Sequence, residues 1–258
     1  MARRGKRRFS KNALIAAAVL AFLIGVGATV ATERLVGRTT FGGMVWTAED
    51  AQESSVNVVA VRSDGLGVVA SLRVRVTPGE GRILVDTHPF VGFDFQAADR
   101  TAVKVAAEIT GFALDDDGIG LKGADVLYTV STQGSGEVEI QSIDGPSAGA
   151  ATTVATIAAF ENKRIKSNVV ITGTIQEDHT LGTIGGVYAK AKAAYDNGMT
   201  LFLVPKGQLV EVYRQAGPFA VTEYVSISYL QQYFQQQGWA LQIEEVSTIE
   251  EAANLMLE

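Results

Sequence analysis

The chain has 258 residues, a formal net charge of −6 and no cysteine. Without cysteine it forms neither disulfides nor thiolate metal sites, and its two separated histidines argue against a zinc hydrolase. Because six basic residues lie within the first 11 positions, the remainder holds 16 Lys/Arg against 28 Asp/Glu, a net charge of −12. This acidic remainder argues against nucleic-acid binding, and we assign no cofactor and no metal.

A basic tail and an apolar segment mark the N-terminus. Residues 1–12 carry the basic cluster, and residues 13–31 run for 19 positions without a charge, close to the ~20 apolar residues that cross a bilayer. Because basic residues stay on the cytoplasmic side, we expect residues 13–32 to form a single transmembrane anchor, with the remaining chain outside the cytoplasm. The alternative is a cleaved signal peptide with Ala28 or Ala31 at the cleavage site, which would yield a secreted protein.

After a spacer at residues 33–55, the patterns predict one α+β domain over residues 56–258, a length suited to a single core. Alternating and β-branched residues over 56–76 predict a β-hairpin. Residues 97–110 repeat apolar side chains at helical spacing up to Gly111, which predicts a helix ending there.

An acidic cluster and three apolar runs follow. Residues 115–117 are aspartates that lack the regular spacing of an EF-hand, so we interpret them as a solvated loop rather than a calcium site. Gly118 follows these aspartates directly, and glycine at this position favours a turn. Strands are predicted at residues 125–131, 169–175 and 201–204.

Residues 144–149 read D-G-P-S-A-G and precede a run of small apolar residues that predicts a buried helix. Gly145 and Gly149 leave room for a substrate backbone, and Pro146 fixes φ at a helix start. The N–H groups at that start could stabilise an oxyanion, so Ser147 lies where a nucleophile would be placed. The alternative interpretation is that Ser147 caps the helix.

A nucleophilic serine needs a base, and this chain offers few. His88 precedes a proline and His179 lies at a polar hairpin tip; either could belong to a Ser-His-Asp triad, although tip histidines are commonly surface residues. We favour Lys190, because helical spacing after Gly186 places it on an apolar stripe and turns Lys192 outward. Removing a lysine from water favours its neutral form. The alternative is that Lys190 extends past alanines to water.

These motifs resemble the proteolytic domain of the Lon family, whose serine–lysine dyad lies in the same two motifs. D-G-P-S-A-G at 144–149, T-G-T-I at 172–175 and L-G-T-I-G-G at 181–186 occur in the family's order. Lys190 follows Ser147 at the family's spacing.

The resemblance implies the Lon proteolytic fold, which is similar to ribosomal protein S5 domain 2. It implies Ser147 as nucleophile and Lys190 as general base and then general acid. Thr172 would orient the lysine amine, and Asp144 would be the acidic residue ahead of the nucleophile loop. Thr174 departs from the pattern, since many relatives carry glutamate there.

The resemblance covers residues 56–204 and 239–258, and residues 206–238 form a divergent insertion. Within it, residues 223–237 predict an amphipathic helix that packs on the core or forms a rim that selects peptides or contacts a neighbouring subunit. Because Lon-type domains assemble into hexameric rings, the resemblance implies a homo-oligomer.

Lon proteases carry an ATPase module, but this sequence contains no G-x-x-x-x-G-K-[ST] phosphate-binding loop. We therefore expect a membrane-anchored, ATP-independent serine endopeptidase that cleaves unfolded or membrane-associated polypeptides through an acyl-enzyme. The alternative is a catalytically silent Lon-like domain that binds peptides or scaffolds an assembly.

Overall fold

A computed structural model describes part of the chain. The described residues are 39–41, 44–46, 51–86, 90–132, 142–216 and 219–258. The basic tail, the segment expected to cross the membrane at residues 13–32, and His88 lie outside them. Among the described residues, no helix is long and apolar enough to span a bilayer.

A four-stranded sheet forms the first layer, with the strand order β3-β4-β7-β5. Long antiparallel pairings join β3 (Gln52–Val61), β4 (Gly67–Pro78) and β7 (Ala124–Thr132), whereas β5 (Ile83–Val85) runs parallel to β7. The β3–β4 pair confirms the hairpin predicted at residues 56–76. On β4 the buried residues alternate with more exposed ones, as expected for a strand with one face on a core.

The predicted spacer at residues 33–55 contains regular structure. β1 (Thr39–Phe41) pairs with β2 (Met44–Trp46) in an antiparallel arrangement. β3 begins at Gln52, within the predicted spacer. The first sheet therefore starts before residue 56.

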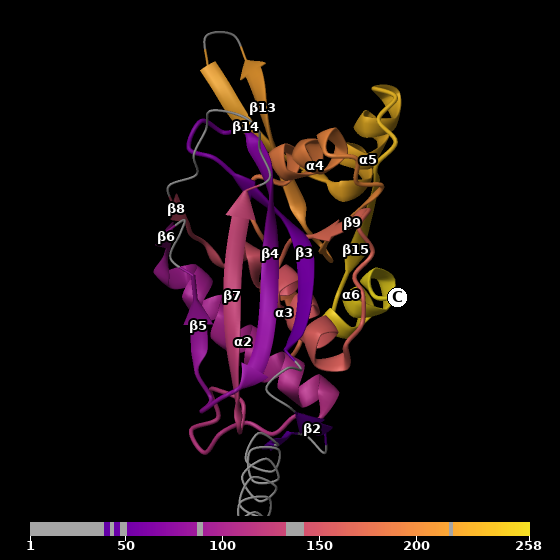
Figure 1. Cartoon of the computed structure of the whole chain (residues 1–258). Coiled ribbons are helices and arrows are strands. Elements are labelled where there is room, and N and C mark those ends of the chain that lie inside the picture. The colour runs from indigo at the N-terminus through magenta and orange to yellow at the C-terminus, as the bar shows by residue number, and fades with distance from the viewer. Residues whose placement is uncertain (1–38, 42–43, 47–50, 87–89, 133–141, 217–218) are drawn as a thin grey trace, which may run out of the picture.

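Two helices pack together on one side of this sheet (Figure 1): α2 (Phe93–Thr110) and α3 (Gly149–Glu161). α2 confirms the predicted helix and ends at Gly111 as expected, but it begins four residues earlier, at Phe93. Side chains from both helices and the sheet form the first core. Its largest fully buried members include Leu72, Phe95, Leu121, Tyr128, Ile157 and Phe160.

A second, parallel sheet has the order β15-β12-β9. It contains β9 (Val169–Ile171), β12 (Leu201–Pro205) and β15 (Gln242–Val246). Because side chains alternate along a strand, Leu203 packs into the first core while Phe202 packs into a second core. The second sheet therefore connects the two cores.

Three helices accompany the second sheet: α4 (Val187–Asp196), α5 (Ile227–Gln236) and α6 (Ile249–Met256). Residues of α4 and α5 lie in the second core, and residues of α6 lie in the first. The described chain is thus a mixture of helices and strands, which agrees with the α+β prediction.

The strand predicted at residues 169–175 is divided in two. β9 ends at Ile171, and β10 (Thr174–Ile175) pairs with β11 (Leu181–Gly182) in a short hairpin. The division arises because the Thr172 N–H bonds to Leu203 of β12, while the Gly173 N–H turns to the Ser147 carbonyl. A second short pair, β6 (Phe90–Val91) with β8 (Ser142–Ile143), runs parallel.

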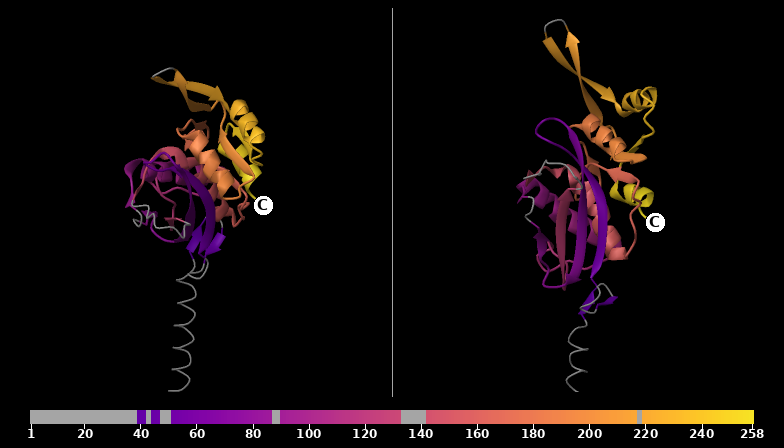
Figure 2. Two further views of the ribbon diagram at one scale, coloured as in Figure 1. Left: turned by 90° about the horizontal axis from the view of Figure 1, so that it is seen from above. Right: turned by 45° about the horizontal axis from the view of Figure 1, so that its top comes forward.

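The helix predicted at residues 223–237 is correct only from Ile227 onward. β13 (Leu209–Ala216) and β14 (Phe219–Ser226) form a hairpin that projects from the rest of the described chain (Figures 1 and 2). Tyr224 and Val225 pair with β13, and Ser226 accepts a hydrogen bond from the Tyr229 N–H to start α5. The β-branched residues of β14 favour a strand, and the Ser226 cap starts the helix after that residue, so residues 223–226 are not helical despite their helical pattern.

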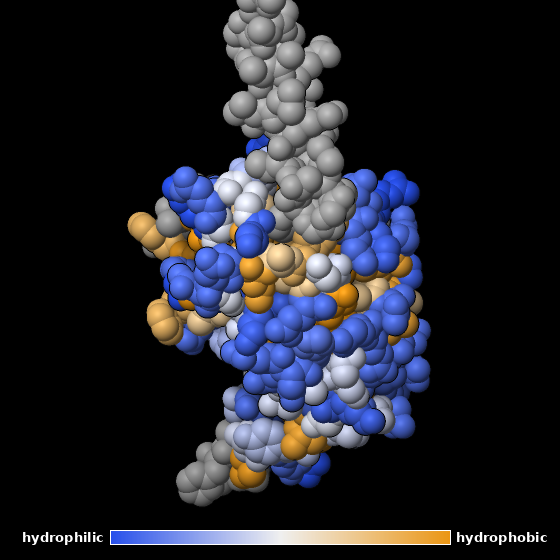
Figure 3. All heavy atoms as spheres, turned by 90° about the horizontal axis from the view of Figure 1, so that it is seen from below, coloured by the Kyte–Doolittle hydropathy of each residue, from blue (hydrophilic) through white to orange (hydrophobic). Residues whose placement is uncertain are grey.

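The outer surface seen from below is mainly hydrophilic, with a smaller apolar area near its centre (Figure 3). The buried apolar side chains are gathered in the two cores. This distribution is expected for a domain whose folding is driven by apolar burial.

Candidate active site

Ser147 lies on a short 3₁₀ turn, η1 (Pro146–Ala148), directly before α3. Gly145 adopts φ 103° and ψ 145°, a conformation that essentially only glycine reaches. At Gly149, an added Cβ would lie 2.9 Å from Ile175 Cγ2 and 3.1 Å from its backbone nitrogen. The two glycines therefore shape the loop and let it approach β10 closely.

The side chain of Ser147 does not cap α3. Ala148 occupies the cap position of that helix, and no side-chain hydrogen bond is made there. Twelve consecutive residues of α3, from Gly149 to Phe160, are buried. This confirms the predicted buried helix and leaves the Ser147 hydroxyl available for other contacts.

Lys190 reaches the Ser147 hydroxyl from α4. Its Nζ donates to Ser147 Oγ at 2.9 Å and to Thr172 Oγ1 at 3.2 Å. Lys190 is only 4% exposed, whereas Lys192 faces outward and pairs with Asp196. The predicted inward and outward orientations of the two lysines are confirmed.

Burial lowers the pKa of Lys190 from 10.5 to about 8. The physical cause is the loss of hydration of its charged form. In the described structure, its ammonium lies against hydroxyl groups and makes no ion pair with a carboxylate. A substantial fraction of Lys190 is therefore a neutral amine near pH 8, able to accept a proton.

Thr172 connects the lysine to the serine loop. Its hydroxyl is fully buried, receives the hydrogen bond from Lys190, and lies 3.1 Å from the Ser147 carbonyl oxygen, to which it donates. The next residue, Gly173, donates its N–H to the same carbonyl at 3.0 Å. Thr172 is thus well placed to orient both the amine and the loop.

Asp144 anchors the other side of the loop. Its Oδ1 accepts from the Gly145 N–H at 2.8 Å and from the Asp94 N–H at 3.2 Å, at the start of α2. A carboxylate is favourable at a helix N-terminus, where free N–H groups point outward. The structure therefore places Asp144 as a link between the Ser147 loop and α2, with no contact to Lys190 among its hydrogen bonds within the described residues.

A small cavity of about 110 Å³ opens beside Ser147. Much of its lining is apolar and comes from β3, β4, β7 and α2, including Ala70, Phe95 and Val130. We did not predict it from the sequence, because it forms between elements that are distant along the chain. It gives the neighbourhood of the serine an apolar surface that an aliphatic side chain can contact.

One buried polar group, the Asp99 carboxyl, was not identified from the sequence. Asp99 on α2 is 1% exposed, and its carboxyl oxygens have no hydrogen-bond partner within the described part of the chain. Burial raises the pKa of Asp99 to about 8, so its carboxyl group is largely neutral at pH 7. Its position four residues after Phe95, on the apolar face of α2, was the available signal.

The acidic run at residues 115–117 makes a turn. Asp115 Oδ1 accepts from the Ile119 N–H at 2.9 Å, and its Oδ2 accepts from the Gly120 N–H at 3.1 Å. Across the described residues, no group of three or more His, Asp or Glu side chains is arranged to hold a metal ion. His179 also lies apart from Ser147, because its ring contacts Glu108 and Glu250.

A known protein family matches the part of the chain that contains this site. Residues 139–236 match the family described as the Lon protease (S16) C-terminal proteolytic domain. The resemblance to the Lon proteolytic domain is confirmed. The match includes Ser147, Thr172 and Lys190, and it runs through most of the segment at residues 206–238 that we interpreted as divergent.

Individual relatives point to the same family. A Lon protease of Clostridium acetobutylicum is 40% identical over 63 residues, which is 24% of this chain and 8% of that protein. An archaeal Lon protease of Thermococcus kodakarensis is 27% identical over 170 residues, covering 64% of this chain and 24% of the relative. The archaeal Lon protease of Archaeoglobus fulgidus is 24% identical over 189 residues, which cover 71% of this chain and 28% of the relative. The chain thus spans less than a third of the length of each of these relatives.

The buried amine leads to a stability prediction for Lys190→Met. Its pKa is about 8 in the folded chain and 10.5 as an ordinary lysine, so the unfolded chain binds more protons between these values and stability rises with pH there. At pH 7 the penalty of the buried charge is complete, and we expect the substitution to raise the free energy of unfolding by on the order of 1–3 kcal/mol.

Urea unfolding at pH 7 and pH 10.5 measures this effect. The gain should largely disappear at the higher pH, and the outward Lys192→Met should change stability little at either pH. Equal effects of Lys190→Met at both pH values would contradict a charge penalty at this position.

Proposed function

We propose that the chain is a serine endopeptidase in which Ser147 is the nucleophile and Lys190 is the general base and then the general acid. The Lon homologues support a serine peptidase. The observation that carries the proposal is the 2.9 Å contact between Lys190 Nζ and Ser147 Oγ, made by a buried lysine whose pKa is lowered to about 8.

The proposed reaction begins with the neutral Lys190 amine. It takes the proton of the Ser147 hydroxyl while Oγ attacks the peptide carbonyl carbon. The positive end of the α3 dipole, which lies directly after Ser147, stabilises the oxyanion. Lys190 then donates its proton to the departing amine, which leaves an acyl group on Ser147 and a neutral lysine.

Hydrolysis repeats these roles with water. Lys190 accepts a proton from a water molecule as its oxygen attacks the acyl carbon, and it returns a proton to Ser147 Oγ when the acid product leaves. Thr172 keeps the amine directed at Oγ, because its hydroxyl lies between Nζ and the Ser147 carbonyl. Asp144, Gly145 and Pro146 hold the shape of the loop.

The proposed substrates are unfolded or membrane-associated polypeptides, cleaved without ATP. The absence of a phosphate-binding loop motif from the sequence supports this choice. The apolar cavity beside Ser147 favours an aliphatic side chain next to the scissile bond. Extended chains suit such a site because the peptide bond must reach a half-buried serine.

We further propose that residues 13–32 anchor the protein in the membrane with the peptidase domain outside the cytoplasm, and that copies assemble into a hexameric ring. The basic tail and the uncharged run of 19 residues support the anchor. The ring rests on the resemblance to Lon-type domains, which form hexamers.

A catalytically silent peptide-binding or scaffolding domain is the alternative. It requires no base beside Ser147. The buried Lys190 favours the enzyme, because a charged lysine in this position lowers stability and a binding surface gains nothing from it.

Substitution of the dyad tests the proposed activity. The full-length protein is incubated with an unfolded protein without ATP, and new peptide ends are quantified. Ser147→Ala and Lys190→Ala should each lower kcat by at least ~10³-fold, because the two residues act as a unit. Lys192→Ala, on the same helix but facing outward, is the matched control and should retain activity. Comparable rates in wild type and both dyad variants would leave the silent domain as the better explanation.

The pH dependence tests the lysine base separately. Because only the neutral amine accepts the serine proton, activity should rise by roughly tenfold per pH unit below the Lys190 pKa of about 8 and then flatten. Initial rates between pH 6 and 10 give this profile. A rate independent of pH across that range would argue against Lys190 as the base.

Membrane attachment is tested by alkaline extraction of membranes that contain the full-length chain. The chain should remain in the pellet, whereas a chain starting at residue 33 should be released. Recovery of a shortened wild-type protein in the soluble fraction would indicate signal-peptide cleavage instead. Native mass spectrometry of the detergent-extracted protein then gives the number of copies.

A further inference from the structure

His179 occupies an unusual position at the tip of the β10–β11 hairpin. Its φ is 68°, in the left-handed region that favours glycine. Among the described residues other than glycine, only Asn162 also has a positive φ, and asparagine tolerates this conformation well. The backbone of His179 therefore adopts a conformation that residues other than glycine rarely take.

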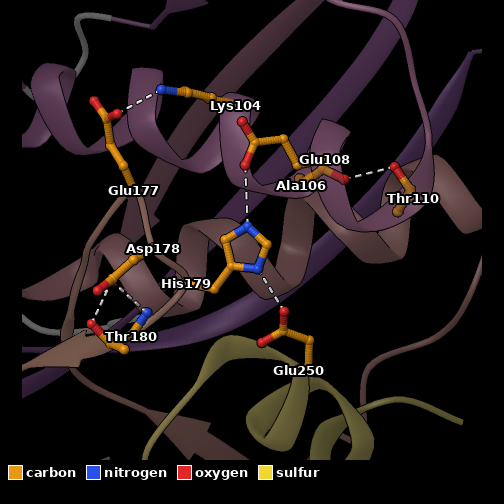
Figure 4. Close-up of polar contacts among 9 residues, drawn as sticks. All are labelled: Lys104, Ala106, Glu108, Thr110, Glu177, Asp178, His179, Thr180 and Glu250. Atoms are coloured by element: carbon orange, nitrogen blue, oxygen red, sulfur yellow. Dashed lines mark hydrogen bonds and ion pairs between the residues drawn. The ribbon is translucent and has the colours of Figure 1, made fainter.

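Both ring nitrogens of His179 face carboxylates (Figure 4). Nδ1 lies 2.6 Å from Glu250 Oε1, and Nε2 lies 3.1 Å from Glu108 Oε2. A neutral imidazole has one N–H donor, whereas the protonated ring has two. Only protonated His179 can donate to both partners.

The two carboxylates come from separate elements. Glu108 belongs to α2 and Glu250 to α6, so the ring joins two helices through the tip of the hairpin. Backbone bonds run beside it, because the Ile249 N–H donates to the His179 carbonyl at 3.0 Å. A second link to α2 is the ion pair between Lys104 and Glu177, at 2.6 Å.

The hairpin is bonded in turn to the Ser147 loop. Gly173, directly before β10, donates its N–H to the Ser147 carbonyl and accepts from the Ala150 N–H, both at 3.0 Å. Ile175 of β10 contacts the position of Gly149. A displacement of the hairpin would therefore act on the backbone that carries Ser147.

We propose that His179 is a positioning residue: protonated and bound to Glu108 and Glu250, it clamps the β10–β11 hairpin against α2 and α6 and so fixes the Ser147 loop. The inference rests on the proposed peptidase function for its effect on activity, but the clamp itself has consequences that need no catalysis. Its ring is 25% exposed, so protons reach it from solvent.

The clamp depends on pH in a defined direction. Hydrogen bonds first to Glu250 and then to Glu108 raise the pKa of His179 above its ordinary value of 6.5. The clamp is complete below pH 6.5 and is lost as the pH rises through the raised pKa, because the neutral ring leaves one carboxylate without a donor. The charged groups facing this cluster are Lys104 and Glu108 from α2, Glu250 from α6, and Glu177 and Asp178 from the hairpin.

The test uses His179→Asn, which tolerates the left-handed backbone and cannot carry the charge. In full-length protein carrying Ser147→Ala, amide hydrogen exchange is measured at pH 6 and pH 9 and corrected for intrinsic rates. At pH 6 the substitution should lower protection by about 2–5-fold both in the hairpin and at Ala150, the factor expected for a partly exposed ion pair. The difference should be small at pH 9.

Two further variants separate the clamp from a general loss of structure. Glu108→Gln retains the histidine and should reproduce the loss at pH 6. Glu177→Gln breaks the neighbouring ion pair with Lys104 and should not produce a pH-dependent change at Ala150. Loss of protection confined to the hairpin tip, or equal losses at both pH values, would overturn the positioning role.

In active protein, the ratio of wild-type to His179→Asn activity should fall by about 2–5-fold between pH 6 and pH 9. A ratio independent of pH would indicate that His179 contributes only to packing and not through its charge. Since the exchange measurement is made without the Ser147 hydroxyl, failure of the proposed peptidase activity would leave the test of the clamp intact.

Discussion

A lysine amine inside a protein must lose its proton or find acceptors, and this requirement governs the arrangement around Ser147. Lys190 is one of the buried residues of α4, together with Val187 and three alanines. Its Nζ contacts the hydroxyls of Ser147 and Thr172. Burial thus sets both the position of the amine and its readiness to accept a proton.

The contact between the two side chains also crosses the boundary between the two cores. Ser147 precedes α3, which belongs to the first core, while Lys190 lies on α4 beside the second. The parallel sheet fixes their separation, because alternate residues of β9 and β12 pack into opposite cores. The hydrogen bond at 2.9 Å therefore depends on the packing of most of the domain.

Local patterns predicted the parts of this site that have a local cause. The glycines around Ser147, the apolar run of α3 and the helical stripe of Lys190 are each contained in one short continuous stretch of chain, and the structure agrees with them. The division of the strand at Thr172, the cavity beside Ser147 and the partners of His179 depend on contacts between residues that are distant along the chain. The periodic pattern of apolar residues along the sequence carries no information about such contacts, so they could not be predicted from the sequence alone.

The uniform burial of α3 has a consequence for how such a protein can diverge. Every side chain from Gly149 to Phe160 touches the interior, so a change on any face of this helix disturbs packing. The β13–β14 hairpin differs, since Leu209, Tyr213 and Tyr224 are well exposed on it. New binding preferences can accumulate on that projecting hairpin at little cost in stability, while the helix that follows the serine allows almost no variation.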